Sequence, residues 1–110
     1  MSNTLSLYTV ILVTCPSIDE AEKIARTLLE KKLVACVNIV SEVRSLFWWK
    51  EKIEESKESL LIIKSRLDKL NNVIDVVKQL HSYSVPEVIA LPIISGFKEY
   101  LKWLEEVIKE

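Results

Sequence analysis

The longest extended segment of the chain, Leu33–Trp49, constrains the fold more than any other feature. It is rich in Val, Ile, Phe and Trp and has no helical repeat of apolar residues, which predicts one long strand bent near Ser41. The polar interval Lys50–Ser59 separates it from the apolar run Leu60–Lys64, a spacing that favours an antiparallel return through a charged hairpin tip. We therefore expect a projecting ribbon whose apolar edge needs a second copy of the chain to cover it.

The segment before this ribbon predicts a strand followed by a helix. Tyr8–Cys15 is a β-branched run that predicts a central strand, and Pro16 ends it. Ser17 and Glu20 have the spacing of a capping box, in which each side chain bonds the backbone N–H of the other residue at a helix start. Apolar residues then recur every three or four positions, so one side of this helix is expected to face a sheet.

The C-terminal half predicts two more helices and one more strand. Apolar residues at helical spacing begin after Ser65 and continue to a helix end between His81 and Ser84, and Pro86 prevents continuation. Val88–Leu91 predicts a short strand, and Ser95–Gly96 opens a final amphipathic helix. The order β-α-β-β-α-β plus a C-terminal helix predicts an α+β fold of the ferredoxin-like sandwich type.

Length and charge narrow the possible functions. The 110 residues suit one domain, residues 1–110, of which only residues 1–6 look loosely held. The 15 Lys+Arg balance 16 Asp+Glu without a basic patch, so a nucleic-acid partner is not expected. The apolar runs are far shorter than the roughly 20 residues that a membrane span requires, and the N-terminus lacks a secretory signal pattern. We expect a cytoplasmic protein without a membrane partner.

Glycine and cysteine content add two expectations. The single glycine, Gly96, excludes the glycine-rich loops that cradle nucleotide phosphates, so no organic cofactor is expected. The two cysteines, Cys15 and Cys36, are expected to be free thiols, each of which could also serve as a small core residue.

His81 is the only histidine, and three roles are open to it. It could cap the second helix, bind a metal ion, or act as a base. Catalysis would need an orienting partner and an oxyanion site, which the sequence does not reveal, so an enzyme is not expected. A metal site would suit Cu or Zn and would need ligands distant in sequence or from several copies of the chain.

Other polar and aromatic residues have two interpretations each. Lys64 and Glu87 flank strand ends, where they either line a cleft or mark the solvent edge. Trp48 and Trp49 form an aromatic pair that favours a subunit interface over a ligand platform.

Several spaced motifs, in the same order, resemble the CutA family of divalent-cation tolerance proteins from Tyr8 to Trp103. The matching segments are Thr14–Pro16, Lys32–Asn38 (KLVACVN), Ser45–Lys50 (SLFWWK), Glu58 with Leu61–Lys64, His81–Glu87 (HSYSVPE) and Tyr100–Trp103 (YLKW). The resemblance implies a ferredoxin-like subunit in a homotrimer similar to the PII signalling proteins. Strands would pair across subunit boundaries, and a cleft between subunits would be lined by Lys64, Tyr83, Glu87 and Trp49.

The family resemblance also implies binding of copper and other divalent cations and a part in metal tolerance. In copper-binding members the ligands are a first-strand cysteine and a His-His-Pro-Tyr motif. Here His81 matches the second histidine, while Leu80 and Ser82 replace the first histidine and the proline. The cysteine position falls on Val13, and Cys15 lies two residues later on the same strand face.

Two functions follow as expectations. The first is a trimeric protein that binds Cu(II) or another divalent cation through His81, Cys15 and Glu87. The second is a PII-like regulatory or scaffold trimer whose cleft takes a small anionic ligand or a partner segment.

Overall fold

The computed structural model describes residues 7–108, within which the chain forms the predicted order of elements. These elements are β1 (Tyr8–Cys15), α1 (Ile18–Glu30), β2 (Cys36–Trp49), β3 (Lys52–Arg66), a 3-10 turn (Leu67–Lys69), α2 (Leu70–Leu80), β4 (Val88–Pro92) and α3 (Lys98–Val107). The prediction of a loosely held segment at residues 1–6 lies outside the described residues.

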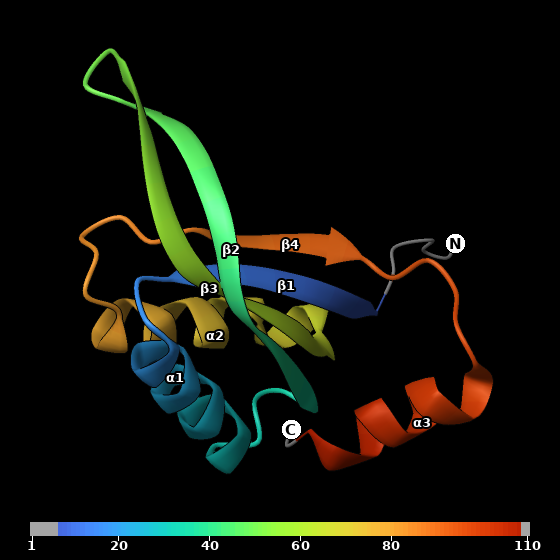
Figure 1. The fold of residues 1–110 in the computed structure, drawn as a ribbon. Helices are drawn as coiled ribbons and strands as arrows, with labels where there is room; N and C mark the ends of the chain where they lie inside the picture. Colours follow the sequence, from blue (N-terminus) through green and yellow to red (C-terminus); the bar gives the residue numbers. More distant parts are fainter. Residues whose placement is uncertain (1–6, 109–110) are drawn as a thin grey trace.

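The four strands of the described part form one antiparallel sheet in the order β2-β3-β1-β4 (Figure 1). The predicted central position of Tyr8–Cys15 is confirmed, because β1 pairs with β3 on one side and β4 on the other. The mixed α+β architecture is confirmed as well. No helix within residues 7–108 is long and apolar enough to cross a membrane.

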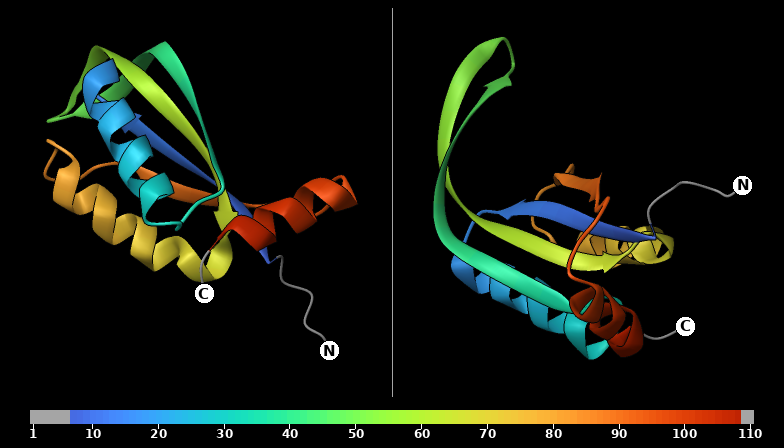
Figure 2. Two further views of the ribbon diagram at one scale, coloured as in Figure 1. Left: turned by 90° about the horizontal axis from the view of Figure 1, so that it is seen from below. Right: turned by 90° about the vertical axis from the view of Figure 1, so that its right-hand side faces the viewer.

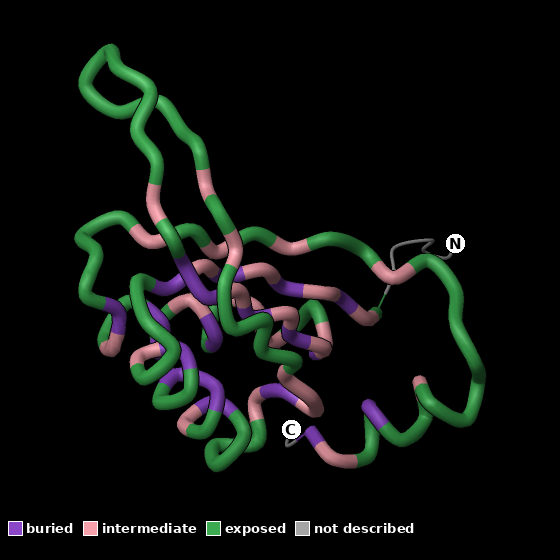
Figure 3. Tube along the Cα trace, in the orientation of Figure 1, coloured by how far each residue is buried: buried purple, intermediate pink, exposed green. Residues whose placement is uncertain are grey.

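The core lies between one face of the sheet and the helices α1 and α2, which lie together on that face (Figure 2). Residues of β1 alternate between buried and half-buried, and Ile11 and Val13 on the helix side are fully enclosed. The apolar stripe of α1 supplies Ile24 and Leu28 to the same cluster. Buried residues accordingly concentrate in this layer, whereas the far half of the hairpin is exposed (Figure 3).

The ribbon formed by β2 and β3 leaves the sheet where β1 ends (Figure 1). The last β1–β3 pair is Cys15↔Ser59, and beyond it β2 and β3 pair only with each other as far as Trp49↔Lys52. A register shift between Val40 and Val43 lies at this point, so the predicted bend near Ser41 is confirmed. The radius of gyration, 14.8 Å, exceeds the roughly 13 Å of a compact domain of this length because the ribbon projects.

Four predicted boundaries are wrong. The long strand does not start at Leu33, because β2 begins at Cys36. The interval Lys50–Ser59 is not a long hairpin tip, since β3 begins at Lys52 and the turn is only Lys50–Glu51, both with positive φ (50° and 64°). Polar residues fill this part of β3 because both faces of the ribbon meet solvent. The second helix does not start at Ser65, because β3 continues to Arg66 in register with Tyr8. The last helix begins at Lys98 rather than at Ser95–Gly96.

The C-terminus of α1 ends in a left-handed residue that is not glycine. Lys32 has φ 57°, and its N–H bonds the Leu29 carbonyl at 2.9 Å while the Leu33 N–H bonds the Leu28 carbonyl at 3.2 Å. These two bonds form the Schellman motif, whose left-handed position favours glycine. The preceding residue, Lys31, keeps a right-handed backbone with φ -80°.

We predict that Lys32→Gly and Lys31→Gly shift stability in opposite directions. Lys32→Gly should raise the free energy of unfolding by about 0.5–1 kcal/mol, because glycine adopts the left-handed conformation without steric cost. Lys31→Gly should lower it by a similar amount, because there glycine adds only chain entropy to the unfolded state. Thermal or urea denaturation checks both variants, and equal shifts for the two would contradict the assignment.

Candidate functional site

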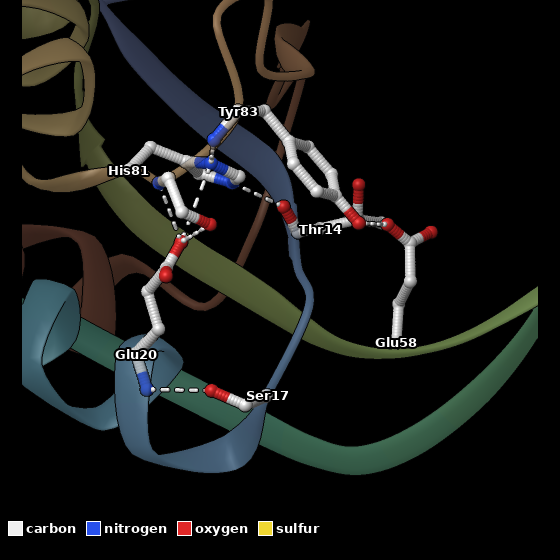
Figure 4. A network of polar contacts seen from close by, with 7 residues as sticks. Thr14, Ser17, Glu20, Glu58, His81 and Tyr83 are labelled. Atoms are coloured by element: carbon white, nitrogen blue, oxygen red, sulfur yellow. Dashed lines mark hydrogen bonds and ion pairs between the residues drawn. The ribbon is translucent and has the colours of Figure 1, made fainter.

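His81 caps α2 and is held on both sides of its ring (Figure 4). Its Nε2 lies 2.7 Å from the carbonyl oxygen of Thr14, and its Nδ1 accepts the backbone N–H of Tyr83 at 3.1 Å. Since a carbonyl can only accept a hydrogen bond, these contacts assign the proton to Nε2 and the lone pair to Nδ1. The side chain is fully buried, so His81 joins the end of β1 to the segment after α2.

Glu20 connects α1 to the same segment (Figure 4). Its Oε2 accepts the backbone N–H of Ser82 at 3.0 Å and the Ser82 hydroxyl at 3.2 Å, and lies 3.3 Å from His81 Nδ1. The Ser17 hydroxyl accepts the Glu20 N–H at 3.2 Å, so this half of the predicted capping box is confirmed. The predicted return bond from the Glu20 carboxylate differs from the capping box. This carboxylate accepts hydrogen bonds from Ser82 in the loop that follows α2 and so fixes that loop.

A cavity of about 910 Å³ lies between the segment 83–87 and the projecting part of the hairpin, along which it reaches Trp49 and Glu54 near the turn. It is lined by Thr14, Arg44, Ser45, Leu46, Phe47, Trp49, Glu54, Glu55, Ser56, Glu58, Tyr83, Ser84, Val85 and Glu87. Glu58 follows the last β1–β3 pair toward the hairpin tip and is only 8% exposed. Its Oε2 accepts the Tyr83 hydroxyl at 2.9 Å, and the Tyr83 ring packs against His81 with centroids 4.8 Å apart.

The carboxylates of Glu20 and Glu58 lie near the end of β1 and contribute to the raised pKa values of two neighbouring side chains. Burial, the hydrogen bond to Glu58 and the charges of Glu58 and Glu20 together raise the pKa of the Tyr83 phenol to about 12. Burial, followed by the charges of Glu20 and Glu58, likewise raises the pKa of the Cys15 thiol to about 12. Cys15 is therefore a protonated core residue at neutral pH.

The structure brings together three of the four residues predicted to line a cleft. Trp49, Tyr83 and Glu87 line the cavity, and the Thr14 hydroxyl donates to Glu87 Oε1 at 3.5 Å. Lys64 lies elsewhere on β3, opposite Cys36, where its ammonium bonds Asn38 Oδ1. The lining of a cleft between copies by all four residues stays a prediction.

The predicted metal ligands are separated within one protomer. Cys15 is enclosed in the core, His81 is held by Thr14 and Tyr83, and Glu87 faces the cavity. Among residues 7–108, no three His, Cys, Asp or Glu side chains are grouped so as to hold a metal ion. Both cysteines are free, as expected, with Cys15 buried and Cys36 half-buried.

Two residues of the site, Glu58 and Glu20, make contacts that the sequence does not predict. Glu58 entered only as part of a family motif, although a carboxylate directly before the buried start of the run Ser59–Ile63 is a signal for a special position. Glu20 was interpreted as a helix cap alone. Its contact with Ser82 joins residues far apart in the chain, so no local pattern could have revealed it.

We predict that Tyr83→Phe destabilises the protein by about 1–3 kcal/mol, because it leaves the buried Glu58 carboxylate without its hydrogen-bond donor. Tyr8→Phe is the matched control. It removes a hydrogen bond to Glu105, an exposed acceptor that water can reach, so it should cost no more than about 1 kcal/mol. Urea denaturation of both variants checks this, and an equal or larger loss for Tyr8→Phe would contradict the role of Glu58.

Comparisons with known proteins agree with this architecture. Residues 9–107 match the model of the CutA1 divalent ion tolerance protein family. The divalent-cation tolerance protein CutA of Archaeoglobus fulgidus is 48% identical over 103 residues, covering 94% of this chain and 100% of that protein. The CutA homolog of Xenopus laevis is 46% identical over 98 residues, covering 89% of this chain and 65% of that longer protein.

A solved structure of the A. fulgidus protein, described as periplasmic, superposes with a TM-score of 0.91 and covers 94% of this chain and 100% of its own. The sequence resemblance and the family match both run from β1 to α3. The chain belongs to the CutA1 divalent ion tolerance family.

Proposed function

We propose that this protein binds divalent cations and acts in metal tolerance, as a cytoplasmic homotrimer of ferredoxin-like protomers that binds ions and does not catalyse a reaction. Membership of the CutA1 family is the main support. The names of its relatives refer to divalent-cation tolerance. Two free thiols and no disulfide suit a reducing compartment.

The charge around the cavity supports a cation over an anion. Glu54, Glu58 and Glu87 line it, and none of them forms an ion pair with a cationic side chain of residues 7–108. An anionic ligand at this place would meet three uncompensated carboxylates. The PII-like alternative, an anionic ligand bound near Lys64, would need a different surface or a second copy of the chain.

The three predicted ligands, which one protomer keeps apart, differ in how readily each could bind an ion. Glu87 has open carboxylate oxygens, apart from a long hydrogen bond from Thr14. His81 offers a lone pair only at Nδ1, so it can bind an ion once its bond from the Tyr83 N–H opens. Cys15 must lose a proton from a thiol with a pKa of about 12, which makes it the last ligand. Imidazole and thiolate ligands favour Cu(II) over Mg²⁺.

The exposed apolar surface supports the trimer. Leu46, Trp48, Trp49 and Ile53 of the hairpin are each more than half exposed. Apolar clusters of this kind mark interfaces, and β2 is an edge strand whose outer side has no partner strand in the described sheet. A second copy of the chain would cover the apolar side chains of the hairpin and the open edge of β2, and it would bring further ligands to the ion.

We predict that native mass spectrometry of the metal-stripped protein detects a trimer that takes up discrete ions from one equivalent of Cu(II) or Zn(II) per chain. Glu87→Gln and His81→Ala should each lower the affinity at least about tenfold, because each removes a ligand. Glu22→Gln, which alters an exposed carboxylate paired with Arg26 far from the cavity, is the control and should bind normally.

Two outcomes would contradict the proposal at different levels. A trimer that binds neither ion would reject cation binding and leave the assembly standing. A monomer would reject the trimer, whatever its metal content.

A further inference from the structure

A cluster of reactive side chains lies at the end of the sheet away from the ribbon. Cys36 begins β2 and is the partner of Lys64 across the β2–β3 ladder, so the two side chains emerge on the same face of the sheet. The Lys64 ammonium nitrogen lies 4.0 Å from the Cys36 sulfur, and it also bonds Asn38 Oδ1. These contacts join two strands of one protomer, so they do not depend on how copies of the chain assemble.

Tyr100 of α3 meets the same sulfur from the other side. A hydrogen bond joins its hydroxyl to Cys36, and burial together with this neighbouring thiol raises the pKa of the phenol. The Tyr100 ring packs on Trp103, with ring centroids 5.5 Å apart. Cys36 is half-buried as a result, with its sulfur held beside the amine of Lys64.

The two cysteines of the chain differ in what surrounds the sulfur. Cys15 is fully enclosed in the core, and its pKa is raised to about 12. Cys36 is a partly exposed thiol beside a cationic side chain, which is the setting in which peroxides oxidise cysteine to a sulfenic acid. A sulfenic acid condenses with a nearby nitrogen to give a sulfenamide. Lys64 supplies that nitrogen at Cys36.

We propose that Cys36 and Lys64 form an oxidative cross-link, a sulfenamide S–N bond that joins β2 to β3. Hydrogen peroxide oxidises the Cys36 thiol to the sulfenic acid and is itself reduced to water. The deprotonated Lys64 amine then attacks the sulfur. The S–O bond breaks, and the departing oxygen takes one amine proton and leaves as a second water.

The cross-link would change both the charge and the rigidity of this end of the sheet. It removes the positive charge of Lys64 and fixes the register of β2 against β3 at their paired positions. The inference goes beyond metal binding and does not depend on it, because neither Cys36 nor Lys64 is among the predicted metal ligands.

Intact mass spectrometry of the metal-stripped protein, treated with a small excess of hydrogen peroxide in the presence of EDTA, tests the proposal. We expect a loss of about 2 Da per chain, because the S–N bond replaces one S–H and one N–H bond. Trypsin should no longer cleave after Lys64, and the peptide that contains it should be joined to the peptide that contains Cys36. Dithiothreitol should restore the original mass, because a thiol attacks the sulfur of the S–N bond.

Two lysine variants separate the amine from the charge. Lys64→Arg keeps a cation beside the sulfur but has no nucleophilic amine, so it should abolish the cross-link and leave a Cys36 sulfenic acid that dimedone traps. Lys57→Arg is the matched control, since Lys57 is an exposed residue of β3 opposite Arg44, and it should cross-link as the wild type does.

Cys36→Ser separates this inference from the proposed function. It should not form the cross-link, yet it should take up Cu(II) and Zn(II) as the wild type does, so failure of the cross-link and failure of metal binding are distinguishable. A wild type whose Cys36 stays a thiol or a stable sulfenic acid would overturn the proposal. A disulfide between Cys15 and Cys36, or an equal cross-link in Lys64→Arg, would overturn it as well.

Discussion

The pairing of β3 with two different strands is the constraint on which the rest of the structure depends. On one side β3 follows β1 from Tyr8↔Arg66 to Cys15↔Ser59, and on the other it follows β2 along the whole ribbon. Where β1 ends, Ser59 donates to the Ser41 carbonyl at 2.8 Å beside the β2 register shift. The ribbon bends away from the sheet at this point, so Glu58, the next residue of β3, lies at the junction and lines the cavity.

The other wall of the cavity is held by hydrogen bonds rather than by a strand. His81 bonds the Thr14 carbonyl of β1, and Glu20 of α1 bonds Ser82, so two elements fix the segment that carries Tyr83 and Glu87. Each of these bonds joins residues separated by more than sixty positions. Loss of one would release a loop whose position sets which side chains face the cavity.

The local charge of the site contrasts with that of the whole chain. The net charge is only -1, yet Glu54, Glu58 and Glu87 face one cavity whose arginine is paired with Glu55. The raised pKa values of Tyr83 and Cys15 have burial as their first cause and the carboxylates of Glu58 and Glu20 as the next. Three carboxylates facing one cavity favour a cation over an anion there, which agrees with the divalent ions in the family's name.

The sequence by itself determined the elements whose side chains meet a core. The central strand Tyr8–Cys15, the Ser17 cap and the bend near Ser41 were predictable because a β-branched apolar run, a capping residue and a break in an extended segment are local patterns in the chain. The strand at Lys52–Ser59 could not be predicted, because a ribbon with solvent on both faces has no alternation of apolar and polar residues. The start of α2 could not be predicted either, because pairing with β1 keeps Ser65 and Arg66 extended. Only the tertiary structure decided that Lys64 lies away from Tyr83, that Cys15 is enclosed, and that Glu58 is buried without a counter-charge. Those facts depend on contacts between distant segments, which no local sequence pattern encodes.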